Sequence, residues 1–201
     1  MKKRLIPALL CLLIFIIFTV GVSYEAHWIH LIDAFGERFL RPQEEAMHLP
    51  FFEAVTKLGS ATYLALFTLF MALLLWIYRK RRSIIPFIIT ALLSSFLVND
   101  VFKPLIHRQR PPYKLMEEWG YSFPSGHSAT ATTVYGAAIV LGCLYLPKRW
   151  HKLTVGALLS LMIAVTIWSR VYLGVHYLSD TLAGLALGLH LIYLLRAIKR
   201  W

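Results

Sequence analysis

Six long runs of apolar residues, separated by short polar segments, dominate the pattern along this chain. The runs are unbroken and do not alternate between apolar and polar positions, as half-buried strands would. A helix needs about 20 apolar residues to cross a hydrocarbon layer about 30 Å thick, and each run is close to that length. The predicted spans are Leu5–Val22, Gly59–Tyr78, Ile84–Phe102, His127–Leu146, Leu153–Arg170 and Tyr177–Leu195. We therefore predict an all-α integral membrane protein, a bundle of six transmembrane helices.

The composition agrees with a lipid environment. Of the 201 residues, 58% are hydrophobic and 15% are charged, whereas a soluble domain carries about 25% charged residues. Nothing along the chain resembles a linker or a low-complexity tract, so we predict a single membrane domain over residues 1–201. Cys11 and Cys143 lie inside apolar runs and indicate neither a disulfide framework nor a zinc site.

The basic residues predict the direction of the spans. The net charge of +11 would suit a nucleic-acid partner if it covered a soluble surface, but most Lys and Arg residues sit at the ends of apolar runs. The four clusters are Lys2–Arg4, Arg79–Arg82, Lys148–Lys152 and Arg196–Arg200. Six spans place all four clusters on one side, and cytoplasmic segments are enriched in Lys and Arg. We predict a cell-membrane protein with both termini cytoplasmic. The first span also has the basic start of a signal peptide, but no convincing cleavage site precedes Tyr24.

Residues 24–58, between the first two spans, contain an amphipathic segment. Its apolar residues recur at helical spacing, while Asp33, Glu37 and Arg38 lie elsewhere on the helical wheel. The apolar residues are Trp28, Leu31, Ile32, Phe35 and Phe39. Two interpretations stay open: a helix in the outer membrane interface, or a connector packed on the bundle.

The first of three polar patches follows the third span. Lys103 and Arg110 are seven residues apart, so both can face one point if the segment is helical. Pro111 disfavours the α conformation at Arg110, and we expect the helix to end there. Two cations near apolar surroundings suit a bound phosphate. Anchoring of the chain at the outer membrane surface is the alternative, and His107 and Arg108 fit anchoring better.

The second patch is Pro124-Ser125-Gly126-His127, which opens the fourth span. Serine is a good helix N-cap, and glycine lets a ligand approach the backbone. The free N–H groups at a helix N-terminus attract anions. On its own, this patch is equally compatible with an ordinary turn and cap.

The third patch joins the fifth and sixth spans. Arg170 adds a third cation on the same side of the membrane. His176 and Asp180 are four residues apart and share a helix face, so Asp180 can accept a hydrogen bond from one ring nitrogen of His176. The other nitrogen is then free to act as a nucleophile. The alternative is a helix-capping Asp bonded to a structural His.

Together, the patches bring three cations, two histidines and one carboxylate to the outer ends of the spans. The sequence offers no acidic cluster to bind magnesium, so we predict phosphoryl transfer without a metal or other cofactor, with fixed cations stabilising the charge. His176 is the predicted nucleophile, and His127 the predicted acid and base. Residues 112–123 are expected to form a loop over this site, with no role assigned.

At these residues, the chain resembles the type 2 phosphatidic acid phosphatase (PAP2) family. The matching motifs are Lys103 with Arg110-Pro111, Pro124–His127, and Ser169-Arg170 with His176 and Asp180. The resemblance implies the family's six-helix core, shared with vanadium haloperoxidases, and no metal. It also implies a phosphate pocket of Lys103, Arg110, Ser125, Gly126, His127 and Arg170, with His176 as nucleophile and Asp180 as its partner.

The short form resembles the bacterial phosphatidylglycerophosphatase B branch. The resemblance implies a lipid substrate, with phosphatidylglycerophosphate favoured and undecaprenyl pyrophosphate as the alternative. A transporter of a phosphate-bearing solute is a further alternative, but transporters bind substrate near the midplane of the membrane, and the polar patches lie at one end of the spans. Transfer of phosphate to another lipid instead of water also stays open, as does the oligomeric state, because Gly184 and Gly188 are better suited to packing within the chain.

Overall fold

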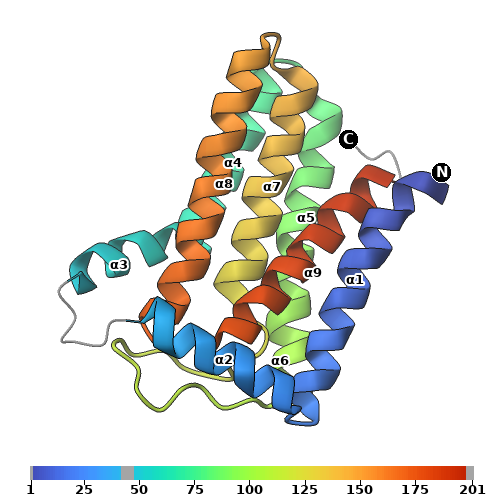
Figure 1. Cartoon of the computed structure of the whole chain (residues 1–201). Helices are drawn as coiled ribbons and strands as arrows, with labels where there is room; N and C mark the ends of the chain where they lie inside the picture. The colour runs from blue at the N-terminus through green and yellow to red at the C-terminus, as the bar shows by residue number, and fades with distance from the viewer. Residues whose placement is uncertain (1, 42–47, 198–201) are drawn as a thin grey trace.

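The computed structural model describes residues 2–41 and 48–197, and no strand occurs in these ranges. Nine α-helices are described (Figure 1). They are α1 (Lys2–Ser23), α2 (His27–Leu40), α3 (Leu49–Thr56), α4 (Ala61–Ile77), α5 (Ile84–Phe96), α6 (Lys103–Ile106), α7 (Gly126–Tyr145), α8 (Arg149–Tyr172) and α9 (Leu178–Ala197). Two 3₁₀ turns, η1 (Lys57–Gly59) and η2 (Arg81–Ser83), and a π-helical segment, η3 (Leu97–Phe102), complete the order.

The predicted all-α membrane fold is confirmed. Five helical stretches in the described chain are long and apolar enough to span a membrane, and the bent pair formed by Leu49–Gly59 and Ala61–Ile77 can make a sixth. The chain bends by 49° between the two parts of this pair. The third span runs from Arg81 to Ile106, because η3 joins α5 to α6 without a break.

Helices α7 and α9 lie at the centre of the bundle, and their packing depends on glycine. A side chain at Gly184 would approach the backbone oxygen of Ser125 to 2.7 Å, and one at Gly188 would approach Cβ of Thr132 to the same distance. The glycine pair of the last span therefore packs against α7 within the chain, as expected. This close contact fixes the start of α7 against the start of α9.

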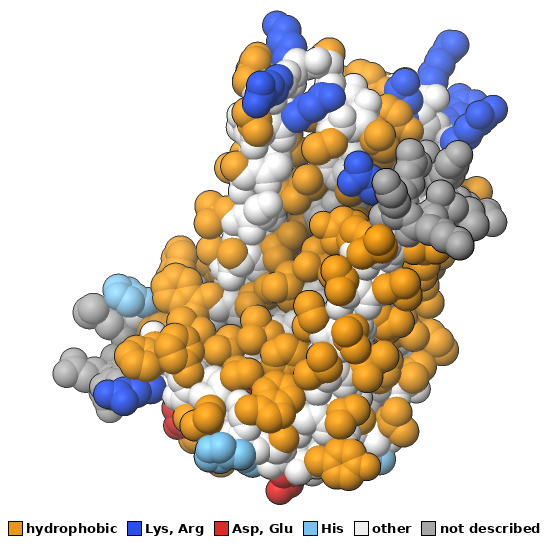
Figure 2. Space-filling view, turned by 45° about the vertical axis from the view of Figure 1, so that its right-hand side comes forward, with side chains coloured by type: hydrophobic (Ala, Val, Ile, Leu, Met, Phe, Trp, Pro, Cys, Tyr) orange, Lys and Arg blue, Asp and Glu red, His pale blue; other side chains and the backbone are white. Residues whose placement is uncertain are grey.

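The outer faces of the remaining spans are apolar. Large exposed side chains follow α1, α4, α5 and α8, including Leu9, Leu66, Leu92 and Leu158. Figure 2 shows this apolar surface on one face of the molecule, with most of the visible Lys and Arg side chains at one end and Asp, Glu and His at the other. This distribution is typical of a protein that crosses a membrane.

The predicted amphipathic segment is α2, which crosses the lower end of the bundle in Figure 1. Its buried face carries Ile29, Asp33 and Gly36, and Gly36 packs against Leu178. Its apolar residues Leu31, Phe35 and Phe39 point outward and are more than half exposed. The helix is therefore both packed on the bundle and apolar on its free side, and its position in the outer membrane interface stays a prediction. The wheel did not predict the burial of Asp33.

The expected end of the third helix at Arg110 is wrong. The helix ends at Ile106, because the next residue, His107, adopts a left-handed conformation with φ of 54°. Lys103 is thus the start of the last helical turn, whereas Arg110 lies in the loop that leads to α7. This loop, residues 107–125, runs under the ends of the spans and carries much of the candidate site.

Candidate active site

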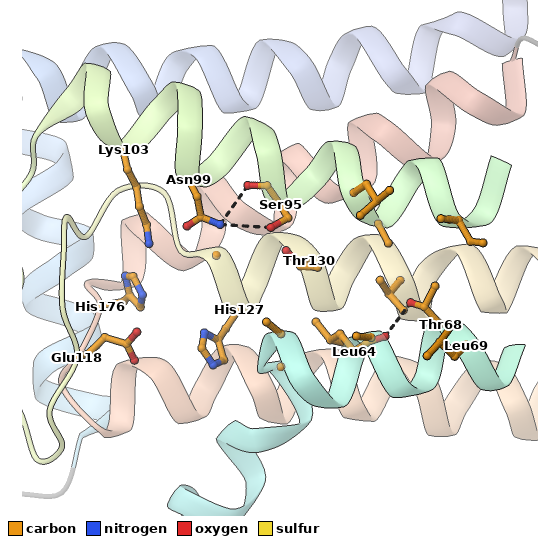
Figure 3. Close-up of a pocket in the computed structure, with 18 residues that line it drawn as sticks. Leu64, Thr68, Leu69, Ser95, Asn99, Lys103, Glu118, His127, Thr130 and His176 are labelled. Carbon is orange, nitrogen blue, oxygen red and sulfur yellow. Dashed lines mark hydrogen bonds between the residues drawn. The ribbon is translucent and has the colours of Figure 1, made fainter. Parts of the chain in front are cut away.

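A cavity of about 530 Å³ opens at the ends of the spans that carry the predicted site. Lys103, His127 and His176, together with Glu118, line one end of it. Figure 3 shows these four side chains pointing into one space from four different segments. The cavity then continues between α4, α5 and α7 along side chains that include Leu64, Leu69, Ala91 and Leu92. It thus joins a charged end to an apolar end.

His176 lies just before α9 and is almost completely buried. Its Nε2 is 3.1 Å from Nη1 of Arg110, and its Nδ1 is 3.3 Å from Oγ of Ser122. Burial, followed by the positive charges of Arg170, Arg110 and Lys103, holds the pKa of His176 well below its usual value. The ring is therefore neutral, which is the form that a histidine nucleophile requires.

Asp180 lies behind His176, but the predicted direct hydrogen bond is absent. Oδ2 of Asp180 is 3.6 Å from Nδ1 of His176, which is too long for a hydrogen bond. The Ser122 hydroxyl lies between them and donates to Oδ2 at 2.5 Å, while the Tyr177 backbone N–H donates to the same oxygen at 2.9 Å. The carboxylate therefore reaches the imidazole through Ser122, and it orients Nδ1 away from the cavity.

Arg170 and Arg110 approach the polar end in different ways. Arg170 is fully buried and donates to Thr56 from Nη1. Arg110 uses much of its guanidinium on the backbone: it donates to the carbonyls of Gly120, Val175 and Trp119 at 2.8–3.0 Å. Arg110 thereby fixes the loop over the site as well as contributing charge beside His176.

Glu118, in the loop over the site, occupies the centre of the cation cluster. Its carboxylate accepts a hydrogen bond from Nη2 of Arg170 at 2.5 Å and lies 3.8 Å from Arg110. Burial alone would raise the pKa of Glu118, but the charge and hydrogen bond of Arg170, with smaller effects of His127 and Arg110, lower it to about 2. An ionised carboxylate therefore sits where the charges favour an anion.

The start of α7 has the predicted cap. The Ser125 side chain accepts a hydrogen bond from the Ser128 N–H at 3.4 Å and is fully buried. Gly126 and His127 line the cavity, whereas Ser125 does not. The Ser125 backbone N–H donates to the Asp180 carbonyl, which ties the start of α7 to the first turn of α9. The second patch thus presents the backbone and His127 to the cavity, with the Ser125 hydroxyl turned into the cap.

The interpretation of Arg108 as a surface anchor is wrong. Arg108 forms 2.5 Å ion pairs with Asp180 and with Asp33 of α2, and it also donates to the Ser179 hydroxyl. Burial opposes its charge, but the two carboxylates raise the pKa of Arg108 above its usual value. His107, by contrast, is exposed and contacts the ring of Tyr121.

Sequence reasoning therefore missed four residues near the site: Asp33, Arg108, Glu118 and Ser122. One available signal was the density of charges in the 107–118 segment of a chain with so few charged residues. Asp33 gave no such signal, because it is distant in sequence and lies on the expected polar face of its helix. Among the described residues, no three His, Cys, Asp or Glu side chains come together in a way that could hold a metal ion.

Comparison with known proteins agrees with this geometry. The PAP2 superfamily profile matches residues 85–201. Phosphatidylglycerophosphatase B of Bacillus subtilis (strain 168) is 33% identical over 154 residues, which cover 73% of this chain and 75% of that protein. The putative undecaprenyl-diphosphatase YbjG of Escherichia coli (strain K12) is 35% identical over 130 residues, 59% of this chain and 60% of that protein.

Two solved structures share the fold. The crystal structure of a transmembrane PAP2-type phosphatidylglycerolphosphate phosphatase from Bacillus subtilis superposes with a TM-score of 0.86 at 27% identity, covering 96% of each chain. The crystal structure of LpxE from Aquifex aeolicus gives a TM-score of 0.59 at 28% identity, covering 78% of this chain and 91% of that chain. The chain therefore belongs to the PAP2 superfamily and is a multi-pass membrane lipid phosphatase.

Proposed function

We propose that this protein hydrolyses phosphatidylglycerophosphate to phosphatidylglycerol through a phosphohistidine intermediate at the extracytoplasmic face of the membrane. The observation that carries this proposal is that one continuous cavity joins the His127 and His176 side chains to the apolar walls of α4 and α5. A lipid phosphate can place its phosphate at the charged end and an acyl chain along the apolar end. The Bacillus subtilis phosphatidylglycerophosphatase B relative favours this lipid among the candidates.

In the first chemical step, Nε2 of His176 attacks phosphorus. The P–N bond forms as the bond from phosphorus to the lipid oxygen breaks, and His127 gives its proton to that oxygen. The products are phosphohistidine and the lipid alcohol. The Nδ1 proton of His176 stays on the ring and faces the Ser122 hydroxyl. The negative charge of Asp180, which accepts from that hydroxyl, stabilises the positive ring that forms.

In the second step, His127 takes a proton from a water molecule, and the oxygen of that water attacks phosphorus. The P–N bond breaks, inorganic phosphate leaves and His176 returns to its neutral form. Lys103, Arg110 and Arg170 stabilise the phosphoryl oxygens in both steps, together with the backbone at Gly126, which lines the cavity. Because Glu118 holds Arg170 in this structure, phosphate binding exchanges one anion for another at that guanidinium.

The distribution of basic residues supports the extracytoplasmic position of the site. Arg79–Arg82 and Lys148–Lys152 form the connections at the end of the spans opposite the cavity's charged end. Figure 2 shows Lys and Arg gathered there. Cytoplasmic segments carry such clusters, so the charged end of the cavity faces outward. Lys199 and Arg200 of the predicted C-terminal cluster lie outside the described residues.

The test is a panel of lipids assayed with the wild-type protein and with His176→Ala in mixed micelles. We expect release of phosphate from phosphatidylglycerophosphate to exceed release from phosphatidic acid and undecaprenyl pyrophosphate. Inorganic vanadate should compete with the lipid, because it mimics the phosphoryl group in transfer. Release of phosphate by the wild type from none of these lipids would reject the proposal.

The second candidate substrate is undecaprenyl pyrophosphate. The Escherichia coli relative, named as a putative undecaprenyl-diphosphatase, favours it, and an outward-facing site suits a lipid carrier released on that face. In the same panel, a larger kcat/KM for undecaprenyl pyrophosphate would reverse the order of the two substrates. Recovery of the phosphoryl group on an added lipid alcohol, instead of as inorganic phosphate, would assign a phosphotransferase.

A further inference from the structure

The Asp180 carboxylate is held by a buried ionic network that reaches a helix far away in the sequence. Nη1 of Arg108 donates to Oδ1 of Asp180 and to the Ser179 hydroxyl, at 2.5 and 2.7 Å. Nη2 of the same guanidinium donates to Oδ2 of Asp33 at 2.5 Å. Arg108 therefore bridges two carboxylates, one from α9 and one from α2.

The α2 side of this network is fixed twice. Besides Arg108, Asp33 accepts a hydrogen bond from the Ser179 backbone N–H through Oδ1 at 2.9 Å, so it caps the first turn of α9. One carboxylate thus holds both the helix that carries Asp180 and the arginine that binds Asp180. Asp33 lies outside residues 85–201, the region matched by the superfamily profile.

The charges explain why the bridge is needed. Asp180 is fully buried and Asp33 is 9% exposed, and two buried carboxylates repel each other unless a cation lies between them. A guanidinium can bind both at once because its N–H groups point in fixed, diverging directions. The ring of Tyr177 lies 4.2 Å from the Arg108 carbon Cζ and covers it on one side. Arg108 can therefore hold only a narrow range of orientations.

We infer that Arg108 and Asp33 are positioning residues for catalysis, which hold the Asp180 carboxylate in the orientation that fixes His176 for attack. This inference rests on the proposed role of His176 as the nucleophile. With Oδ1 of Asp180 held by Arg108, Oδ2 faces the Ser122 hydroxyl and the Nδ1 side of His176. Nε2 is then the nitrogen that faces the cavity. A small rotation of the carboxylate would turn the ring away from phosphorus, and misplacement by about 1 Å can cost roughly 100-fold in rate.

The first test variant is Arg108→Lys, which keeps the positive charge but lacks the branched guanidinium that binds two carboxylates at once. We expect kcat to fall roughly 10- to 100-fold, with KM and the inhibition constant of vanadate within about twofold of wild type, because Arg108 does not touch the phosphate in this mechanism. Asp33→Asn keeps an oxygen for the Ser179 N–H and should lower kcat less. Glu37→Gln, one turn further along α2 and half exposed, is the matched control and should retain wild-type kcat.

Arg108→Gln gives a second readout, the acid limb of kcat/KM against pH. His176 is faced by Lys103, Arg110, Arg170 and His127 and by the carboxylates of Glu118 and Asp180, none of which this substitution changes. Loss of the Arg108 charge leaves the field of Asp180 less compensated, which stabilises the imidazolium and raises the pKa of His176. Less of the neutral nucleophile is then present in acid, so the acid limb moves to higher pH. Arg108→Lys keeps the charge and should leave the limb unmoved.

A purely structural role would lower only the amount of folded protein, so all rates are normalised to the monodisperse fraction. Wild-type kcat in folded Arg108→Lys and Asp33→Asn would overturn the inference, as would an equal loss in Glu37→Gln. Arg108→Lys and Asp33→Asn still decide the matter if Arg108→Gln fails to insert. Retained turnover in His176→Ala would instead overturn the proposed mechanism, so the two failures are distinguishable.

Discussion

The two ends of the cavity differ in what they do for a lipid phosphate and in how they are built. At the charged end, Lys103, Glu118, His127 and His176 converge from separate segments, and buried ion pairs fix their neighbours. At the other end, Leu64, Leu69 and Leu92 offer apolar surface that a lipid tail can contact without hydrogen bonds. The charged end can recognise phosphate, but it cannot distinguish one lipid from another by its tail.

This difference assigns chemistry and lipid choice to separate parts of the molecule. Changes at the charged end should alter turnover for every substrate, because all candidates present the same phosphoryl group. Changes at the apolar end should alter KM and depend on tail length. The following predictions test that separation.

The largest effect is expected for His176→Ala, which removes the proposed nucleophile. Without a nucleophile no phosphohistidine forms, and phosphate release should fall to background for long-chain and short-chain substrates alike. The measurement is inorganic phosphate release, with ³²P labelling of the wild-type enzyme to detect the intermediate, quenched in alkali because the P–N bond of phosphohistidine is labile in acid. Normal turnover in this variant would contradict the assignment of His176.

His127→Ala should have the next largest effect. Loss of the acid and base lowers the rate roughly 10²- to 10⁴-fold, and both chemical steps need this group. The defect in the first step, measured as the burst of released alcohol before steady state, should shrink with a substrate whose leaving group departs without a proton, such as p-nitrophenyl phosphate. With that substrate, labelled phosphoenzyme should accumulate, because the water step still lacks its base. An equal defect in the first step with both leaving groups would argue against His127 as the acid.

A substitution at the apolar end should produce a smaller effect that depends on the tail. Ala65 lines the cavity and Leu66, the next residue of α4, does not, so Ala65→Phe and Leu66→Phe form a matched pair. Filling the groove should raise KM roughly 10-fold for a long-chain phosphatidic acid, since overpacking costs about 1–3 kcal/mol. A soluble short-chain substrate should keep its kcat/KM. If both substrates lose activity equally in Ala65→Phe, the apolar end does not hold the tail.

The sequence predicts the spans well because each must supply its own apolar surface and satisfy its own backbone in lipid. The long runs that became α1, α7, α8 and α9 leave little freedom in where a helix starts or ends. The third span was less predictable at its end. Its last turn ends at Ile106, because His107 adopts a left-handed conformation. The helix therefore ends before the position at which Pro111 was expected to end it.

The motif residues could be named from the sequence because their types and spacing point to one phosphate. The network behind them could not. Arg108 and Arg110 carry the same side chain in the same loop. Arg108 points to Asp33 and Asp180, whereas Arg110 points to His176. Ser122 is an ordinary serine until folding places it between His176 and Asp180. Such pairings depend on tertiary distance, which local sequence patterns do not encode.

The smallest expected effect is that of a chelator. In the proposed mechanism the charge of the phosphoryl group is neutralised by Lys103, Arg110 and Arg170, whose positions are fixed by the protein. EDTA should therefore leave kcat within about twofold of its starting value, and Mg²⁺ should not restore activity to Lys103→Ala. Both are measured as phosphate release after dialysis against EDTA, with and without added Mg²⁺. Strong loss with EDTA, restored by Mg²⁺, would mean that a metal ion supplies charge that we assign to side chains. The charged end of the cavity would then consist of a bound metal ion as well as the side chains named above.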